Sequence, residues 1–159
     1  MSLKPQVCSF EEFDYKSEPI QVILMSHILE HALDVNIWIE KARELLVSDG
    51  ILVIALSNFN NMFRYILQEC DPYICPPAHL NYFSYKSLSR LLSMHGFEIL
   101  AVQWVSRFPQ KTFRNRLPGV ARLILPVVRG VSFLALKFLD VLHLSIMINV
   151  YARKKGRCE

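Results

Sequence analysis

Glycine is scarce in this sequence, which holds five glycines in 159 residues. They lie far apart along the chain, at Gly50, Gly96, Gly119, Gly130 and Gly156. No two of them are close enough to form a Gly-x-Gly turn, the element that lets the backbone approach a cofactor in dinucleotide-binding folds. The 159 residues therefore contain no glycine-rich cofactor cradle.

Cysteine pairs with the spacing of metal ligands are also absent. The four cysteines are Cys8, Cys70, Cys75 and Cys158, and no two of them form a Cys-x-x-Cys pair. This spacing predicts free thiols and no metal site. Residues 2–16 lack the apolar core of a signal peptide, so we expect a cytoplasmic protein, peripheral to the membrane if it binds one.

Hydrophobic residues make up 52% of the chain, a fraction typical of a folded domain. The charged residues are distributed unevenly along it. Residues 1–105 hold 7 lysines and arginines against 12 acidic residues, a net charge of −5. Residues 106–159 hold 11 against 2, a net charge of +9. A basic C-terminal third indicates an anionic partner or an ordinary solvated surface.

The segment Leu117–Leu142 is the most unusual part of this basic third. Taken as a helix, it gathers its charges on one narrow stripe and is otherwise apolar; the charges are those of Arg122, Arg129, Lys137 and Asp140. They argue against a membrane span. Two interpretations remain, a cationic amphipathic helix on an anionic membrane surface and a helix that covers a pocket or packs on a partner.

Two apolar runs on either side of a helical pattern indicate an α/β fold. Ile20–Met25 and Ile51–Leu56 are nearly continuous apolar segments, typical of strands buried on both faces. Between them Asp34 is a predicted N-cap for a helix over Val35–Val47, and Gly50 suits a left-handed turn after it. The order predicts a βαβ unit with parallel strands.

The remaining sequence predicts two further helices and two further strands. The helices are a short one ending near Cys70 and one from the N-cap Ser84 to His95, and the strands are Phe97–Val105 and Ser145–Arg153. Asn58 and Asn61 are interpreted as turn residues. We predict a single domain over 1–159, made of the βαβ unit 20–56, a loop, helix and strand over 57–108, an amphipathic helical insertion over 109–144 and a closing strand over 145–154.

Several short motifs occur in a characteristic order. They are Leu29-Glu30-His31, Leu45-Leu46-Val47-Ser48-Asp49-Gly50, the stretch Pro77–Ser84 with the pattern Pro-x-His-Leu-x-x-Phe-Ser, Gly96-Phe97 and the terminal Tyr151–Lys154. This order resembles the C-terminal half of class I S-adenosylmethionine-dependent methyltransferases of the ubiquinone-biosynthesis and small-molecule type. The resemblance implies a partial Rossmann-like fold, with a mostly parallel sheet and an antiparallel closing strand, but without the N-terminal cofactor-binding strands.

The resemblance also implies a site at the ends of the strands. Met25, Ser26 and His27 would border the methionine end of S-adenosylmethionine. His31 and His79 would face the acceptor, where an imidazole can take a proton near neutral pH. For both histidines a structural interpretation stays open, in which His31 bonds the backbone at the start of the helix and His79 fixes its proline-rich loop.

Three functions are consistent with these observations. In the first, the chain is a methyltransferase portion that acts on an unidentified small-molecule acceptor and is inactive alone. In the second, a second copy or a complementing chain completes the methyltransferase. In the third, the chain is a non-catalytic module for oligomerisation or for binding a membrane surface. The apolar strand Ile20–Met25 would be an exposed edge, so we expect a dimer or larger assembly through that edge or through Leu117–Leu142. Nucleic acid is not an expected partner.

Overall fold

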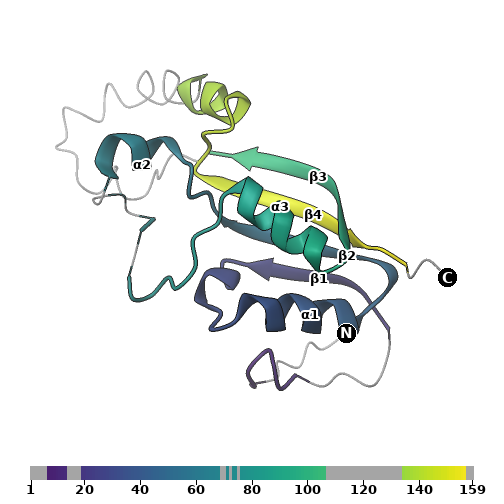
Figure 1. Cartoon of the computed structure of the whole chain (residues 1–159). Coiled ribbons are helices and arrows are strands. Elements are labelled where there is room, and N and C mark those ends of the chain that lie inside the picture. The colour runs from purple at the N-terminus through teal and green to yellow at the C-terminus, as the bar shows by residue number, and fades with distance from the viewer. Residues whose placement is uncertain are drawn as a thin grey trace, which may run out of the picture.

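A computed structural model describes residues 7–13, 19–68, 71, 73–74, 76–106 and 134–156. The elements alternate along the chain as an α/β fold requires (Figure 1). They are β1 (Ile20–Ser26), the 3-10 helix η1 (Leu29–His31), α1 (Val35–Leu45), β2 (Leu46–Ser57), α2 (Met62–Leu67), α3 (Tyr85–Met94), β3 (Phe97–Val105) and β4 (Met147–Lys154), and residues 134–141 are helical as well.

The four strands form one mixed sheet in the order β1-β2-β4-β3. β1 and β2 are parallel and joined through α1, which confirms the predicted βαβ unit. β4 lies between β2 and β3 and is antiparallel to both. β1, β2 and β3 therefore run in the same direction and β4 alone is reversed, in agreement with the expected parallel strands and antiparallel closing strand. Because β4 is inserted between β2 and β3, two of the three pairings in this mixed sheet are antiparallel.

The core lies between one face of the sheet and the helices α1 and α3, which cover the same side in Figure 1. Successive side chains of a strand point to opposite faces, so every second residue of β2 and β4 enters this core. The buried strand residues include Leu52, Ile54, Leu56, Ile148, Val150 and Ala152. From the helices, Ile39 and Leu88 meet them.

The other face of the sheet is much more open. Val22 and Leu24 of β1 are 57% and 63% exposed, whereas Met25 is buried. The prediction that the run Ile20–Met25 is buried on two faces is wrong among the described residues, because the helices placed there cover one side only. In the run Ile51–Leu56 the residues that alternate with the buried ones are half-buried. β1 is also an edge strand of the sheet.

Two glycines shape the turns, in different ways. Gly96 has a φ of +73°, the left-handed conformation that glycine adopts without steric cost, and it follows α3 as predicted. The residue with positive φ near Gly50 is Asp49, at +61°, so the expected left-handed glycine is wrong. Gly50 serves a close approach instead, because a Cβ there would lie 3.0 Å from the carbonyl oxygen of Val47.

The unusual segment Leu117–Leu142 is described from residue 134 onward, so Arg122 and Arg129 lie outside the described residues. Lys137 and Asp140 are among the described residues, and the Nζ atom of Lys137 forms an ion pair with Oδ2 of Asp140 at 3.6 Å. No helix in the described ranges is long and apolar enough to cross a membrane.

Candidate functional site

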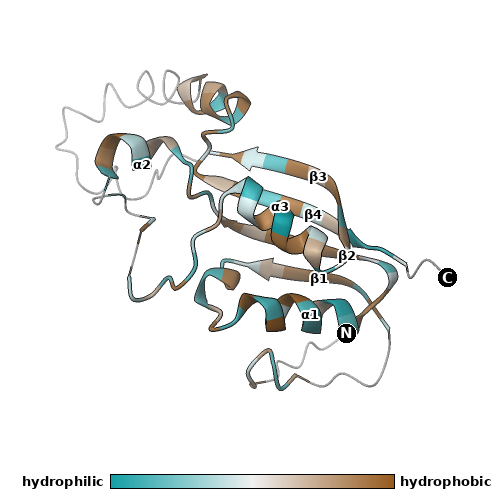
Figure 2. Ribbon diagram, viewed as in Figure 1, coloured by the Kyte–Doolittle hydropathy of each residue, from teal (hydrophilic) through white to brown (hydrophobic). Residues whose placement is uncertain are grey.

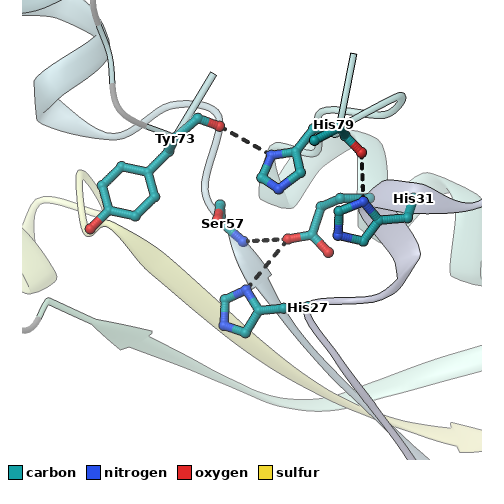
Figure 3. A network of polar contacts seen from close by, with 7 residues as sticks. His27, His31, Ser57, Tyr73 and His79 are labelled. Atoms are coloured by element: carbon teal, nitrogen blue, oxygen red, sulfur yellow. Dashed lines mark hydrogen bonds and ion pairs between the residues drawn. The ribbon is translucent and has the colours of Figure 1, made fainter. Parts of the chain in front are cut away.

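Glu30 connects three segments at the carboxyl ends of β1 and β2. Figure 3 shows the surrounding residues His27, His31, Ser57 and His79. Its side chain is in the core of this region, since the residue is 2% exposed. Oε1 accepts the backbone N–H of Ser57, at the end of β2, at 3.1 Å. The backbone oxygen of Glu30 accepts the N–H groups of Leu80 and Asn81 at 2.9 and 3.0 Å. Glu30 therefore fixes the proline-rich loop against the ends of both strands.

His31 and His79 lie side by side in this region, with ring centroids 5.0 Å apart. The Nδ1 of His31 lies 2.6 Å from the carbonyl oxygen of Ala78, and the Nδ1 of His79 lies 3.3 Å from that of Tyr73. A carbonyl oxygen only accepts, so each Nδ1 must carry the proton. In a neutral imidazole this leaves the lone pair, and so the basic atom, at Nε2.

These contacts bear on both interpretations of the two histidines. The ring of His79 bonds the backbone within its own loop, as the structural interpretation expects, whereas His31 bonds Ala78 of that loop and not the backbone at the start of the helix. In both residues the bond fixes the tautomer that a general base needs. The structure thus brings His31 and His79 together with their Nε2 atoms as the basic positions.

His27 is the third histidine at the site, and it follows β1 directly. Its Nδ1 lies 3.6 Å from Oε1 of Glu30, and its side chain is 45% exposed. The backbone φ of His27 is +51°, an uncommon value for a residue other than glycine, and its N–H donates to the carbonyl oxygen of Ala55 at 2.8 Å. Packing of the strand end onto β2 holds His27 in this conformation.

The two residues before His27 point in different directions. The side chain of Met25 is part of the hydrophobic core, and Ser26 is exposed. Met25 can therefore face a ligand only with its backbone, whereas Ser26 and His27 can also offer their side chains.

Two buried polar atoms in this region have no hydrogen-bond partner among the residues that the structure describes. They are Oε2 of Glu30 and the hydroxyl of Tyr82, and both residues line one small cavity together with Asn58, His79 and Asn81. Buried polar atoms are nearly always paired in folded proteins, so such atoms need an explanation. The cavity offers one acceptor and one donor to a small polar group.

A buried amide network next to this cavity was not predicted. Asn58 follows β2, and its Nδ2 donates to the carbonyl oxygen of Ser145 at 2.9 Å. Asn61 donates to the backbone oxygen of Asn58 at 2.9 Å and to Oδ2 of Asp71 at 3.0 Å. The interpretation of both asparagines as simple turn residues is incomplete, because they are buried and join the loops after β2 to the start of β4.

The phenol of Tyr73 is also part of this region. Burial raises the pKa of Tyr73 above its usual value, and the nearby Asp71 raises it further. The Tyr73 hydroxyl therefore keeps its proton at neutral pH and can donate a hydrogen bond. No group of three or more histidine, cysteine or acidic side chains within the described ranges has the geometry to hold a metal ion.

A comparison with models of protein families identifies the family of this chain. The model of a methyltransferase domain matches residues 3–102, which is more than half of the chain. The chain therefore belongs to the class I S-adenosylmethionine-dependent methyltransferase domain family. No curated protein matches the chain in sequence.

Solved structures of methyltransferases share the fold. A protein of Thermotoga maritima described as a possible histamine N-methyltransferase matches with a TM-score of 0.62 at 15% identity, over 93% of this chain and 62% of its own. The 1,6-didemethyltoxoflavin-N1-methyltransferase of Burkholderia thailandensis, solved with 1,6-didemethyltoxoflavin and S-adenosylhomocysteine, matches with a TM-score of 0.56 at 17% identity, over 94% of this chain and 49% of its own. The chain spans 49% to 62% of the length of these two proteins.

Proposed function

We propose that this chain supplies the acceptor side of a methyltransferase active site and acts on a small molecule that carries a hydroxyl or amino group. The observation that carries the proposal is the position of His31 in η1 and of His79 in the loop before α3, which meet at the carboxyl ends of β1 and β2 with Nε2 as the basic atom. Ligands of open α/β sheets bind at this edge. The unpartnered Oε2 of Glu30 and hydroxyl of Tyr82 add an acceptor and a donor for the polar group of such a molecule.

Bound S-adenosylmethionine supplies an activated methyl group that an acceptor oxygen or nitrogen takes by in-line attack. The residues of this chain fit a part of that cofactor, because Ser26 and His27 can contact its methionine end but no glycine-rich turn is present in the sequence. His31 or His79 takes the proton that the acceptor loses, at Nε2, while the bond from Nδ1 to a backbone carbonyl holds the ring in place. Glu30 and the loop that it fixes contribute by positioning the acceptor for the attack.

The 159-residue chain is expected to bind S-adenosylmethionine too weakly for micromolar affinity, because the glycine-rich turn that grips the cofactor is not in its sequence. Isothermal titration calorimetry of the purified chain tests this expectation. A dissociation constant in the micromolar range would show that the residues present suffice for binding. His27→Ala would then show whether the predicted methionine-end contact contributes to that affinity.

We also propose that a second copy or a complementing chain pairs with the free edge of β1. The specific observation is that β1 is an edge strand whose Val22 and Leu24 are exposed apolar residues. Such an edge is a template for pairing with another strand. The non-catalytic alternative, an oligomerisation module derived from a methyltransferase, uses the same edge.

Multi-angle light scattering at micromolar concentration should give at least twice the mass of the monomer. Leu24→Lys places a charge on the apolar edge and should return the mass to that of one chain. Leu100→Lys is the matched control, because Leu100 is 50% exposed on β3, the opposite edge of the sheet, and should leave the assembly intact. A monomeric unmodified chain contradicts pairing of two copies through β1, and an equal effect of the two variants contradicts this edge as the interface.

A further inference from the structure

The end of the molecule beside the site carries an exposed apolar surface. On the helical residues 134–141, Leu134, Phe138 and Val141 are 70%, 63% and 75% exposed. Their spacing of four and three residues places them on one face of the helix. Leu139, on another face, is buried. The helix therefore contacts the protein on one side and presents three large apolar side chains on another.

The neighbouring helix α2 extends this surface. Tyr65 and Ile66 of α2 are also exposed, and Figure 2 shows hydrophobic residues on both helices at the same end of the molecule. One backbone bond joins the start of α2 to the segment that follows the other helix, since the N–H of Met62 donates to the carbonyl oxygen of Leu144 at 3.1 Å. We call Tyr65, Ile66, Leu134, Phe138 and Val141 the apolar end.

The apolar end is held next to the proposed acceptor site. Asn58, which lines the cavity at Glu30, donates to the carbonyl oxygen of Ser145 at 2.9 Å, three residues beyond Leu142. Tyr65 also lines a groove with Phe59 and Ile74, and the Phe59 ring lies 5.6 Å from that of Tyr82. A surface to which the apolar end binds would thus lie close to the acceptor.

The charge of the sequence that precedes this helix indicates the kind of surface. Lys137 lies on the helix between Leu134 and Phe138, and the only acidic residue of this helix, Asp140, is paired with it. In the sequence, residues 107–133, which connect β3 to this helix, contain six lysines and arginines and no acidic residue. Apolar side chains flanked by cationic ones are typical of helices that lie in the interface of an anionic bilayer.

We propose that the apolar end docks this protein onto an anionic lipid bilayer, with Leu134, Phe138 and Val141 inserted at the interface. The amphipathic pattern of the helix and the excess of basic residues in the sequence before it favour an anionic lipid surface. The docked protein would present its acceptor site to molecules that partition into the membrane.

Co-sedimentation of the full chain with vesicles tests this proposal. Vesicles of phosphatidylcholine with about a third phosphatidylglycerol should bind the chain ~tenfold more strongly than pure phosphatidylcholine, and salt should weaken the binding. The variant with Leu134→Gln, Phe138→Gln and Val141→Gln should lose ~tenfold in affinity for the anionic vesicles. Phe138→Gln alone should lower the affinity for the anionic vesicles by a smaller factor. Circular dichroism establishes that each variant is folded.

A matched control carries the same three-glutamine change elsewhere. Ile37, Met94 and Leu100 are 48%, 69% and 50% exposed and lie outside the apolar end. Their replacement by glutamine should leave vesicle binding within about twofold of the original. No binding to anionic vesicles, equal binding to neutral ones, or equal losses in the two triple variants would overturn the proposal. So would a triple variant that changes only the mass in light scattering, since the apolar end would then be an interface between proteins.

Discussion

Phe97→Ala is expected to lower the free energy of unfolding by about 3–5 kcal/mol, the range for truncating a buried phenylalanine. Phe97 is the largest of the fully buried side chains within the described ranges, at 1% exposure. It begins β3 directly after Gly96, and it belongs to the cluster that α1, α3 and the sheet share. Truncation removes apolar contacts and leaves a cavity that the paired strands around it cannot close.

Urea unfolding followed by circular dichroism measures this effect. Leu100→Ala is the matched control, because Leu100 lies on the same strand but is half exposed, and it should cost less than about 1 kcal/mol. Similar losses for the two variants would mean that Phe97 is not enclosed in a packed core. A domain of this size has a total stability of about 5–15 kcal/mol, so Phe97→Ala is a severe change.

Glu30→Ala is expected to cost about 1–3 kcal/mol, the range for leaving a buried donor without its acceptor. The donor is the backbone N–H of Ser57, which has Oε1 of Glu30 as its partner at the end of β2. Truncation also removes packing at a residue that is almost fully buried. The loop that contains His79 should lose part of its support, because Glu30 occupies the point where that loop meets the strand ends.

Glu30→Gln separates the hydrogen bond from the carboxyl group. Glutamine keeps an oxygen that can accept from Ser57, so it should cost less than about 1 kcal/mol in the same unfolding measurement. Equal losses for Ala and Gln would show that the carboxyl group itself, and not the accepted bond, stabilises the region. Loss of methyl transfer by Glu30→Gln in a complete enzyme, with stability retained, would assign Glu30 a role toward the acceptor.

Local sequence was informative wherever one segment contains its own signal. Asp34 and Ser84 were predicted as N-caps, and both side chains accept the backbone N–H groups that begin α1 and α3. The strand over Phe97–Val105 has the bounds that its pattern predicts. Such signals act between residues a few positions apart, so they do not depend on how the elements later pack.

Contacts between distant segments could not be predicted from the sequence. Asn58, Asn61 and Asp71 are ordinary turn-forming residues when considered one at a time, and their burial arises because the start of β4 packs against the loop after β2. The choice of tautomer in His31 and His79 likewise depends on carbonyl groups that lie 47 and 6 positions away in the chain. No local pattern specifies these partners.

The sequence by itself determined the α/β class, the βαβ unit and the scarcity of glycine, because composition and periodicity are properties of the chain alone. Only the tertiary structure decided that β4 separates β2 from β3 and that, in the part of the chain described, Val22 and Leu24 of β1 are exposed. It also decided that His27, Glu30, His31 and His79 meet at one edge of the sheet. The reason is that a strand's neighbours and a side chain's partners are set by packing across the whole domain. A buried Glu30 and two oriented imidazoles exist as a site only after that packing has occurred.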